Sequence, residues 1–433
     1  MTTNRVTELL TRLDREQATV ARRERRYRGD TQLRYASTEV TGDLALFGVN
    51  LCALAVDAVA ERMRVKTFRV LVGERDVTDR VRAEWRRSNM DQHLMPVLVD
   101  ALALGACYLT VWPDTPGRPV ITPESARHMT VARDPLTSEV IDAVKRWREL
   151  DHNGTAVATH VVHYGREQIT RYRADGYGGR LVPVEGAAVA NPLGVVPVVP
   201  LVNIERVGDT SGASVIDDLA HLVDALGKLL ADMLVASEDV ARPRRWATGV
   251  DLDDGDDDDG WTADGDLDDP DTLASDEPPA PAVSPFDSGN RMFTVESPDA
   301  KFGQLPGADL AGYKTGVELI LQQIMAVSAL PAHMVGVTTA NPSSADAIRA
   351  AEASLTARAE ARIAVLGVAI ERALALVAAF TEHVDPRDVD VRVRWASTAT
   401  KSTAQEADAV TKLFSLGILD VAEAREMMGL TDL

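Results

Sequence analysis

The fold is decided by residues 309–352, which read DLAGYKTGVELILQQIMAVSALPAHMVGVTTANPSSADAIRAAE. In the first part of this stretch, apolar side chains recur at steps of three and four residues: Leu310, Tyr313, Val317, Ile320, Ile324 and Val327. Such a series predicts a helix over residues 309–329 with one continuous apolar stripe, which is typical of helices that pack side by side. Leu330-Pro331 should end that helix, because proline cannot donate a backbone hydrogen bond.

A longer helix is expected to start at the end of the quoted stretch. In Asn341-Pro-Ser-Ser-Ala-Asp346, Ser343 can cap the helix and Asp346 completes a capping box. The residues from Ser344 to Phe380 are rich in alanine and contain no proline. An unbroken helix of that length would span about 55 Å. We expect a bend at Gly367, because glycine inside a helix weakens it by about 1 kcal/mol.

A partner for the first helix is predicted upstream, from Ser214 to about Ala241. Its apolar residues have the same spacing: Val215, Leu219, Leu222, Leu226, Leu229 and Met233. Between the two helices, residues 247–305 are acidic, rich in proline and weakly stranded, which indicates a small irregular module. Within it, residues 251–277 hold fourteen acids and no lysine or arginine. A solvated loop is the favoured interpretation, and weak binding of a divalent cation is the alternative, since no EF-hand register is present.

The rest of the chain combines helices with short strands. Helices are predicted at 3–28, 44–64 and 91–107, and after the long helix at 403–416 and 421–428. Strands rich in Val, Thr, Tyr and Trp are predicted at 107–112, 140–150, 155–164, 168–173 and 389–395. Turn sequences such as Asp-His-Asn-Gly at 151–154 separate the strands of the first group, which favours an antiparallel meander, and residues 192–204 are an extended connector. The fold class is therefore α+β, mainly helical, with an inserted meander.

Composition excludes several classes of protein. The chain has 433 residues, with 46 Lys+Arg against 66 Asp+Glu and a formal net charge of −20. A surface this acidic repels duplex DNA, which argues against a protein that grips DNA tightly. Aromatic residues amount to only 5%, too few for a platform that stacks on single strands. Cys52 and Cys107 lie in apolar runs and indicate reduced core thiols of a chain made in the cytoplasm. No signal peptide or membrane span is expected.

None of the motifs that could perform chemistry is complete, so we expect no catalytic residues, cofactor or metal. Gly307–Thr315 resembles a phosphate-binding loop, but Tyr313 separates the second glycine from Lys314. His160 and His163 are three residues apart on a strand, so their side chains should point to opposite faces. Ser214 is better explained as a helix cap than as a nucleophile. The basic helix at 3–28 has eight Arg and four acids, and a solvated or protein-contacting face is favoured over nucleic-acid binding.

The order of these elements resembles the portal proteins of tailed double-stranded DNA bacteriophages, in the form common among actinobacterial siphophages. The most specific likeness is Ala329–Gly336 (ALPAHMVG) followed by Asn341–Glu352 (NPSSADAIRAAE). The opening helices (YRGD at 27–30 and NLCALAVDAVAER at 50–62) and the closing segment (Trp395 with residues 401–419) are also similar. The resemblance covers nearly the whole chain and includes no catalytic signature.

The resemblance implies a division of the chain into the parts of a portal subunit. These are a wing at 1–205, a first stem helix at 206–241, a clip at 242–305 with the acidic loop 251–277, a second stem helix at 306–329, a tunnel loop at 330–342, a long wing helix at 343–384 and a short crown at 385–433. The loop residues expected to face DNA are Pro331, His333, Met334, Gly336, Thr338, Thr339 and Asn341. The residues expected to pack the stem are Leu219, Leu226, Val317, Ile320 and Ile324.

The resemblance also implies the assembly and its partners. Twelve copies usually form a ring at one vertex of the capsid, and the ring is the channel for DNA packaging and ejection. Expected partners are double-stranded DNA, the terminase large subunit, the head–tail adaptor, and the major capsid and scaffolding proteins. No membrane is expected as a partner. The protein would be made in the bacterial cytoplasm and would become part of the virion. Two alternatives stay open: another ring-forming connector or capsid-associated protein, and a nucleotide-hydrolysing packaging motor.

Overall fold

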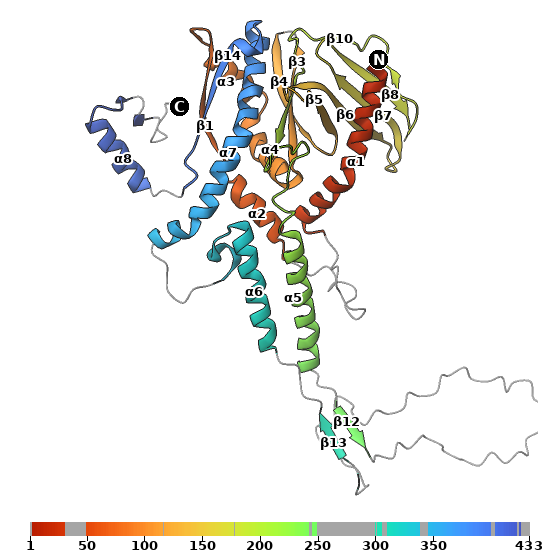
Figure 1. Cartoon of the computed structure of the whole chain (residues 1–433), viewed down its shortest axis with the longest axis vertical. Coiled ribbons are helices and arrows are strands. Elements are labelled where there is room, and N and C mark those ends of the chain that lie inside the picture. Colours follow the sequence, from red (N-terminus) through yellow and green to blue (C-terminus); the bar gives the residue numbers. More distant parts are fainter. Residues whose placement is uncertain are drawn as a thin grey trace, which may run out of the picture. The chain divides into compact units, whose positions relative to one another are not determined.

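The computed structural model describes residues 2–30, 49–115, 117–176, 178–241, 245–248, 299, 301–304, 310–337, 345–399, 403–421 and 424–425 (Figure 1). The chain divides into two compact units. One unit combines Met1–Leu229 with Gly316–Leu433, and the other is Leu230–Thr315. The first unit is therefore built from two separate stretches of sequence.

The predicted meander is the largest sheet of the first unit. Its strands run in the order β10-β8-β7-β6-β5, and β9 pairs with β8. The bounds are β5 Met129–Arg133, β6 Val140–Leu150, β7 Ala156–Tyr164, β8 Gln168–Asp175, β9 Val182–Pro183 and β10 Val189–Ala190. The N-terminal helix α1 (Thr2–Arg28) packs on one face, where Val6 and Leu9 join the buried Val144, Val161 and Tyr172 (Figure 1). The predicted strands and helix in this region are confirmed.

A second sheet follows the buried helix α4 (Met90–Leu104), in the order β11-β3-β4. The strands are β3 Ala106–Thr115, β4 Arg118–Ser125 and β11 Val198–Val202. The prediction of a helix up to residue 107 was wrong at its end. Gly105 has φ of +94°, a left-handed conformation that ends the helix and starts β3 at the next residue. The predicted extended connector 192–204 is confirmed for its second half, where β11 pairs with β3, whereas residues 192–195 form a turn with Gly194 at φ of +64°.

The third sheet joins the two ends of the chain. Strand β14 (Val389–Trp395) pairs along its length with β1 (Val65–Val72), and β2 (Arg75–Asp76) pairs with the end of β1. Helix α3 (Thr78–Arg87) packs on β1 of this sheet, whereas α2 (Leu51–Ala60) packs against α4. Residues 389–395, which the resemblance assigns to the short crown at 385–433, lie in the same sheet as β1, because their backbone completes its ladder.

The long helix is confirmed as α7 (Ala345–Glu382). It runs without interruption through Gly367, so glycine is needed there for another reason. A Cβ at this position would lie 3.2 Å from Nε1 of Trp395, the last residue of β14. By length and composition α7 could cross a membrane, but 67% of its most apolar window is buried inside the protein, as in a core helix.

The two helices with matching apolar spacing are α5 (Ala220–Ala241) and α6 (Ala311–Ser328). Helix α5 starts later than Ser214, because residues 215–219 form turns and Ser214 Oγ accepts from the Ile216 amide (3.1 Å). In the second unit, β12 (Arg245–Thr248) and β13 (Lys301–Gln304) form a two-stranded ribbon. The acidic residues 251–277 lie outside the described residues.

The remaining elements are short. They are the 3₁₀ helices η2 (Ala332–Val335) and η3 (Pro386–Asp388) and the C-terminal helix α8 (Thr403–Ser415). The predicted helix 421–428 falls largely outside the described residues.

Candidate interaction surfaces

The loop that follows α6 starts as a compact turn. Ser328 Oγ donates to the carbonyl oxygen of Ile324 (2.6 Å) and accepts from the Leu330 amide (3.2 Å). Pro331 then precedes η2, and Gly336 ends η2 with φ of +78°. Of the residues predicted to face DNA, His333 and Gly336 are exposed and Met334 is half-buried. Pro331 is buried in the single chain, at the start of η2. Thr338, Thr339 and Asn341 lie outside the described residues.

The loop is held against α7 by polar contacts. His333 Nε2 lies 3.4 Å from Glu352 Oε1, and Arg62 Nη2 lies 3.3 Å from the other oxygen of the same carboxylate. Glu352 is almost buried, with 9% of its side chain exposed. One helical turn and a half further along α7, Arg358 Nη2 donates to the Val327 carbonyl oxygen (2.5 Å). The first residues of the loop therefore cannot move away from α7 without breaking these contacts.

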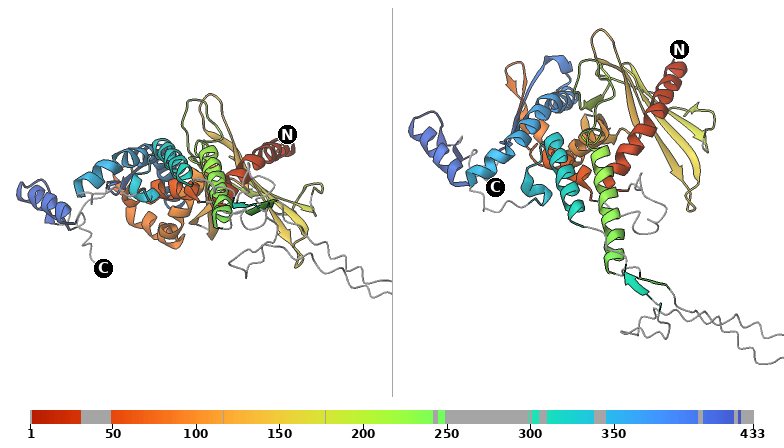
Figure 2. Two further views of the ribbon diagram at one scale, coloured as in Figure 1. Left: turned by 90° about the horizontal axis from the view of Figure 1, so that it is seen from below. Right: turned by 60° about the horizontal axis from the view of Figure 1, so that its bottom comes forward.

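The predicted helix-packing residues divide into two groups. Leu219, Leu226 and Ile324 are 1%, 2% and 0% exposed, so their side chains are already buried within one chain. Val317 and Ile320 are half-buried and remain available for a neighbour. Here α5 and α6 lie side by side (Figures 1 and 2), and a Cβ at Gly316 would come within 2.9 Å of Leu229 Cδ2.

One exposed apolar side chain of α6 was missed by the sequence pattern. Leu319 is 58% exposed, next to the half-buried Ile320. It lies off the three–four stripe, so the spacing that identified the helix did not identify this residue.

Two arginines of α1 clamp the start of α5. Arg26 makes a bidentate pair with Asp224, with both N–O distances 2.9 Å and side chains only 8% and 6% exposed. Its Nη1 also donates to the Ala220 carbonyl oxygen (3.1 Å). The hydrogen bond with Asp224 raises the pKa of Arg26 above its ordinary value. Arg23 Nη2 lies 2.6 Å from Asp217 Oδ2, and its Nη1 donates to the Leu104 carbonyl oxygen (2.6 Å).

These contacts distinguish between protein contact and nucleic-acid binding for two arginines of the basic helix. The side chains of Arg23 and Arg26 are committed to protein contacts, so they do not form a surface for nucleic acid. The charge pattern of α1 favoured a solvated or protein-contacting face, and for these two residues the protein contact is confirmed.

The glycine–lysine motif and the two strand histidines, which resemble functional motifs in the sequence, have structural surroundings. Lys314 lies within α6, directly after Tyr313, and Gly307 lies outside the described residues. His160 Nε2 is 3.0 Å from Glu149 Oε2 and its ring stacks on Trp147, whereas His163 is buried with Nε2 2.8 Å from Asp142 Oδ1. The two histidines point to opposite faces of the sheet, as predicted.

The described part of the chain contains no cluster of metal ligands, and its two cysteines are buried. No group of three or more His, Cys, Asp or Glu side chains is placed there to hold a metal ion. Cys52 and Cys107 are buried free thiols, as predicted. Burial raises the pKa of Cys52 to about 11 and also raises the pKa of Cys107, so both stay protonated at neutral pH.

Comparison with known proteins gives consistent results. The sequence profile of the family described as "Phage portal protein, SPP1 Gp6-like" matches residues 7–432. The portal protein of Mycobacterium phage D29 is 29% identical over 391 residues, which cover 87% of this chain and 75% of that protein. The portal protein of Mycobacterium phage L5 is 28% identical over 391 residues, covering 87% and 74%.

Solved structures with a similar chain come from gene transfer agent particles. A chain from the neck of the empty particle aligns with a TM-score of 0.46 at 16% identity, covering 92% of this chain and 95% of that one. A chain from the neck of the native particle aligns with a TM-score of 0.42 at 14% identity, covering 88% and 89%.

Proposed function

The chain belongs to the SPP1 Gp6-like family of phage portal proteins, and we propose that it assembles into a homo-oligomeric ring at one capsid vertex, with twelve copies as the expected number. The ring is the channel through which DNA is packaged and later ejected. During packaging it binds the terminase large subunit, and afterwards it binds the head–tail adaptor. The observation that carries this proposal is the family match, which spans residues 7–432 without restriction to one part of the chain.

The electrostatics of the chain suit a channel that does not hold DNA. Each phosphate that a protein neutralises releases counterions and adds affinity, so a basic channel would slow a moving duplex. This chain carries a formal net charge of −20. In the described part of the loop, residues 329–337, the one ionisable side chain is His333, which lies beside Glu352. We propose that this loop, with residues up to 342, faces the DNA.

The helices suit a ring of copies packed side by side. Helix α6 leaves Val317 and Ile320 half-buried and Leu319 exposed in the single chain. Apolar side chains in this position gain stability when a neighbouring copy covers them. We therefore propose α5 and α6 as the stem helices, with the clip between them, α7 as the long wing helix, and residues 396–433 as the remainder of the crown.

Electron microscopy of the purified protein tests the proposal. We expect class averages that show rings with rotational symmetry and a central hole. Lone chains under every condition, including in assembled heads, would refute it. We further propose that the chain has no enzymatic role; nucleotide hydrolysis that is abolished by Lys314→Ala would establish a motor instead.

A further inference from the structure

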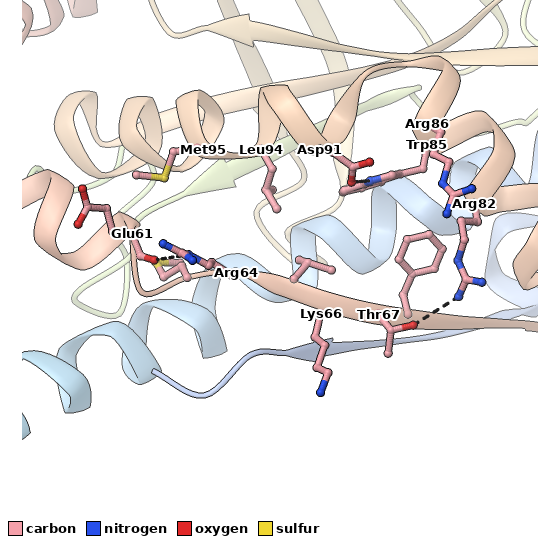
Figure 3. Close-up of a pocket in the computed structure, with 13 residues that line it drawn as sticks. Glu61, Arg64, Lys66, Thr67, Arg82, Trp85, Arg86, Asp91, Leu94 and Met95 are labelled. Atoms are coloured by element: carbon pink, nitrogen blue, oxygen red, sulfur yellow. Dashed lines mark hydrogen bonds between the residues drawn. The ribbon is translucent and has the colours of Figure 1, made fainter. Parts of the chain in front are cut away.

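A groove of about 930 Å³ opens between α4, α3 and the first half of β1 (Figure 3). Its floor is apolar: the rings of Phe68 and Trp85 lie 5.6 Å apart, and Leu94 of α4 projects towards the strand. Its rim is charged and mostly basic. The charged residues are Glu61, Arg64, Lys66, Arg82, Arg86 and Asp91.

Two arginines of the rim differ from the other arginines nearby. Between residues 62 and 87, six arginines form ion pairs with carboxylates: Arg62, Arg69, Arg75, Arg80, Arg82 and Arg87. Among the described residues, Arg64 and Arg86 have no such carboxylate partner, and both side chains are exposed. Arg64 donates only to a main-chain oxygen, that of Glu61 (3.0 Å). The groove therefore presents two guanidinium groups that can still receive an acidic side chain.

The strand that lines the groove also has an open edge. One edge of β1 is paired with β14, and the other is paired with β2 only at Leu71 and Val72. Val70 uses this second edge for hydrogen bonds with Thr78 Oγ1 (2.9 Å) and the Val77 amide (3.0 Å). Main-chain groups two residues earlier in a strand face the same edge, so Phe68 presents its backbone to the groove. These main-chain groups can therefore form hydrogen bonds with a segment that docks in the groove.

The end of α8 has the complementary chemistry. Gly417, with φ of +69°, closes the helix: its amide donates to the Phe414 carbonyl oxygen (3.0 Å), and the Ile418 amide donates to that of Leu413 (3.1 Å). This capped end carries Leu416, Ile418 and Val421 at 72%, 63% and 61% exposure. Asp420 adds a negative charge, and the sequence that follows has three more acids against one arginine. A cluster of exposed apolar residues of this kind marks a docking segment.

The position of the C-terminal segment points to a neighbouring copy as its acceptor. The Ala396 amide donates to the Arg64 carbonyl oxygen (2.8 Å), so the chain leaves β14 at the rim of the groove. Residues 396–402 then lead to α8, a linker that spans at most about 25 Å. In a rotationally symmetric ring, the same residue lies at the same height in every copy. Each C-terminal segment therefore starts at the height of its neighbour's groove, while in its own chain it stays exposed.

We propose that residues 416–421 of one copy, the turn that closes α8, bind in the groove of the next copy against Phe68 and the open edge of β1. Asp420 meets Arg64 and Arg86, and the apolar side chains around it cover Phe68 and Trp85. This inference rests on the proposed ring, because only a ring supplies every groove with a neighbouring C-terminal segment.

Disulfide cross-linking between copies tests the docking. Chains carrying Met95→Cys, at the groove, are mixed with chains carrying Ile418→Cys, assembled and mildly oxidised. The native thiols Cys52 and Cys107 are buried and do not interfere. We expect a band of two linked chains on a non-reducing gel, lost on reduction. Gln92→Cys, exposed on the same helix but outside the groove, is the matched control and should give no such band.

A charge reversal adds a second readout. Arg86→Glu should diminish the linked band, and Asp420→Arg in the partner chain should restore it. The same preparations are imaged by electron microscopy. Rings without the linked band would overturn the docking while the ring stands. A third sample is a chain that carries both Met95→Cys and Ile418→Cys, and linkage found only within such single chains would also overturn the docking. Preparations with lone chains only would refute the proposed function and the docking with it.

Discussion

The buried ion pair between α1 and α5 allows a quantitative prediction. Replacing Arg26 by leucine removes a guanidinium that makes two 2.9 Å contacts with Asp224 and one 3.1 Å contact with the Ala220 carbonyl oxygen. The carboxylate left behind is only 6% exposed, so water cannot replace the lost partner. Removing one partner of a buried pair costs about 3–5 kcal/mol. Asp224 keeps another polar contact, which places the expected loss near the lower end, at about 3 kcal/mol.

The assay is urea unfolding followed by tryptophan fluorescence, at one protein concentration for all variants. Arg25→Leu is the matched control, because Arg25 is exposed one residue earlier on the same helix and should change stability by less than about 0.5 kcal/mol. The double variant Arg26→Leu with Asp224→Leu should recover most of the loss, since an apolar pair of similar volume removes the buried charge as well. A single Arg26→Leu variant that is no less stable than Arg25→Leu would refute this reasoning. So would a double variant as unstable as the single one.

Three further predictions follow from burial. Ile324→Asp should prevent folding, because Ile324 is 0% exposed in one chain. Leu319→Asp should fold, as judged by circular dichroism, but should fail to form rings, as judged by light scattering. The opposite outcome would show that Ile324 is the inter-chain contact. Gly312→Ala, whose methyl group meets nothing, should stabilise the protein by about 0.5–1 kcal/mol in urea unfolding. Gly367→Ala should gain less than Gly312→Ala, because its methyl group would meet the indole ring of Trp395 and part of the gain in helix propensity is lost. Burial holds the pKa of Cys52 at about 11 in the folded chain, against 9.0 for an exposed thiol. The thiol of the unfolded chain therefore loses its proton first, and the free energy of unfolding should fall as pH rises from 9 to 11. The Cys52→Ala variant should show a smaller fall.

Elements with a clear period could be predicted from the sequence. The three–four spacing of α6 and the alanine-rich run of α7 located these helices to within two residues, and the spacing of α5 located that helix but placed its start six residues too early. The strands β6 and β14 were predicted with the bounds that the structure shows. Each of these signals is local, because it depends only on residues close together in the chain.

Features that depend on distant residues could not be predicted. Strand β1 was missed because Lys66 and Arg69 break its alternation, and it is stabilised by β14, more than 300 residues later. The burial of Arg26 was also missed, because a basic helix normally keeps its charges in water. A signal was present in the sequence: Arg23 and Arg26 are about one turn apart on α1, and the complementary acids Asp217 and Asp224 lie seven residues apart at the start of a second helical segment. Only the structure brings the two pairs together.

For the candidate surfaces, the sequence located the loop and the helices but not the direction of individual side chains. Pro331 was expected at the channel and is buried in the single chain, and Leu319 was not expected at all. Such differences depend on the rotation of a helix or turn by a fraction of its period, which spacing alone does not determine.

The pairing of β1 with β14 has a consequence for the timing of folding in the cell. Residues 65–72 leave the ribosome early, but their partner strand at 389–395 emerges more than 300 residues later. At about 5–20 residues per second, the first strand waits for roughly 15 to 65 seconds before its ladder can close. A chain whose translation stops early lacks that strand altogether. Closure of this sheet therefore distinguishes chains translated as far as β14 from shorter fragments, and only the former would have the finished surface that enters a closed assembly.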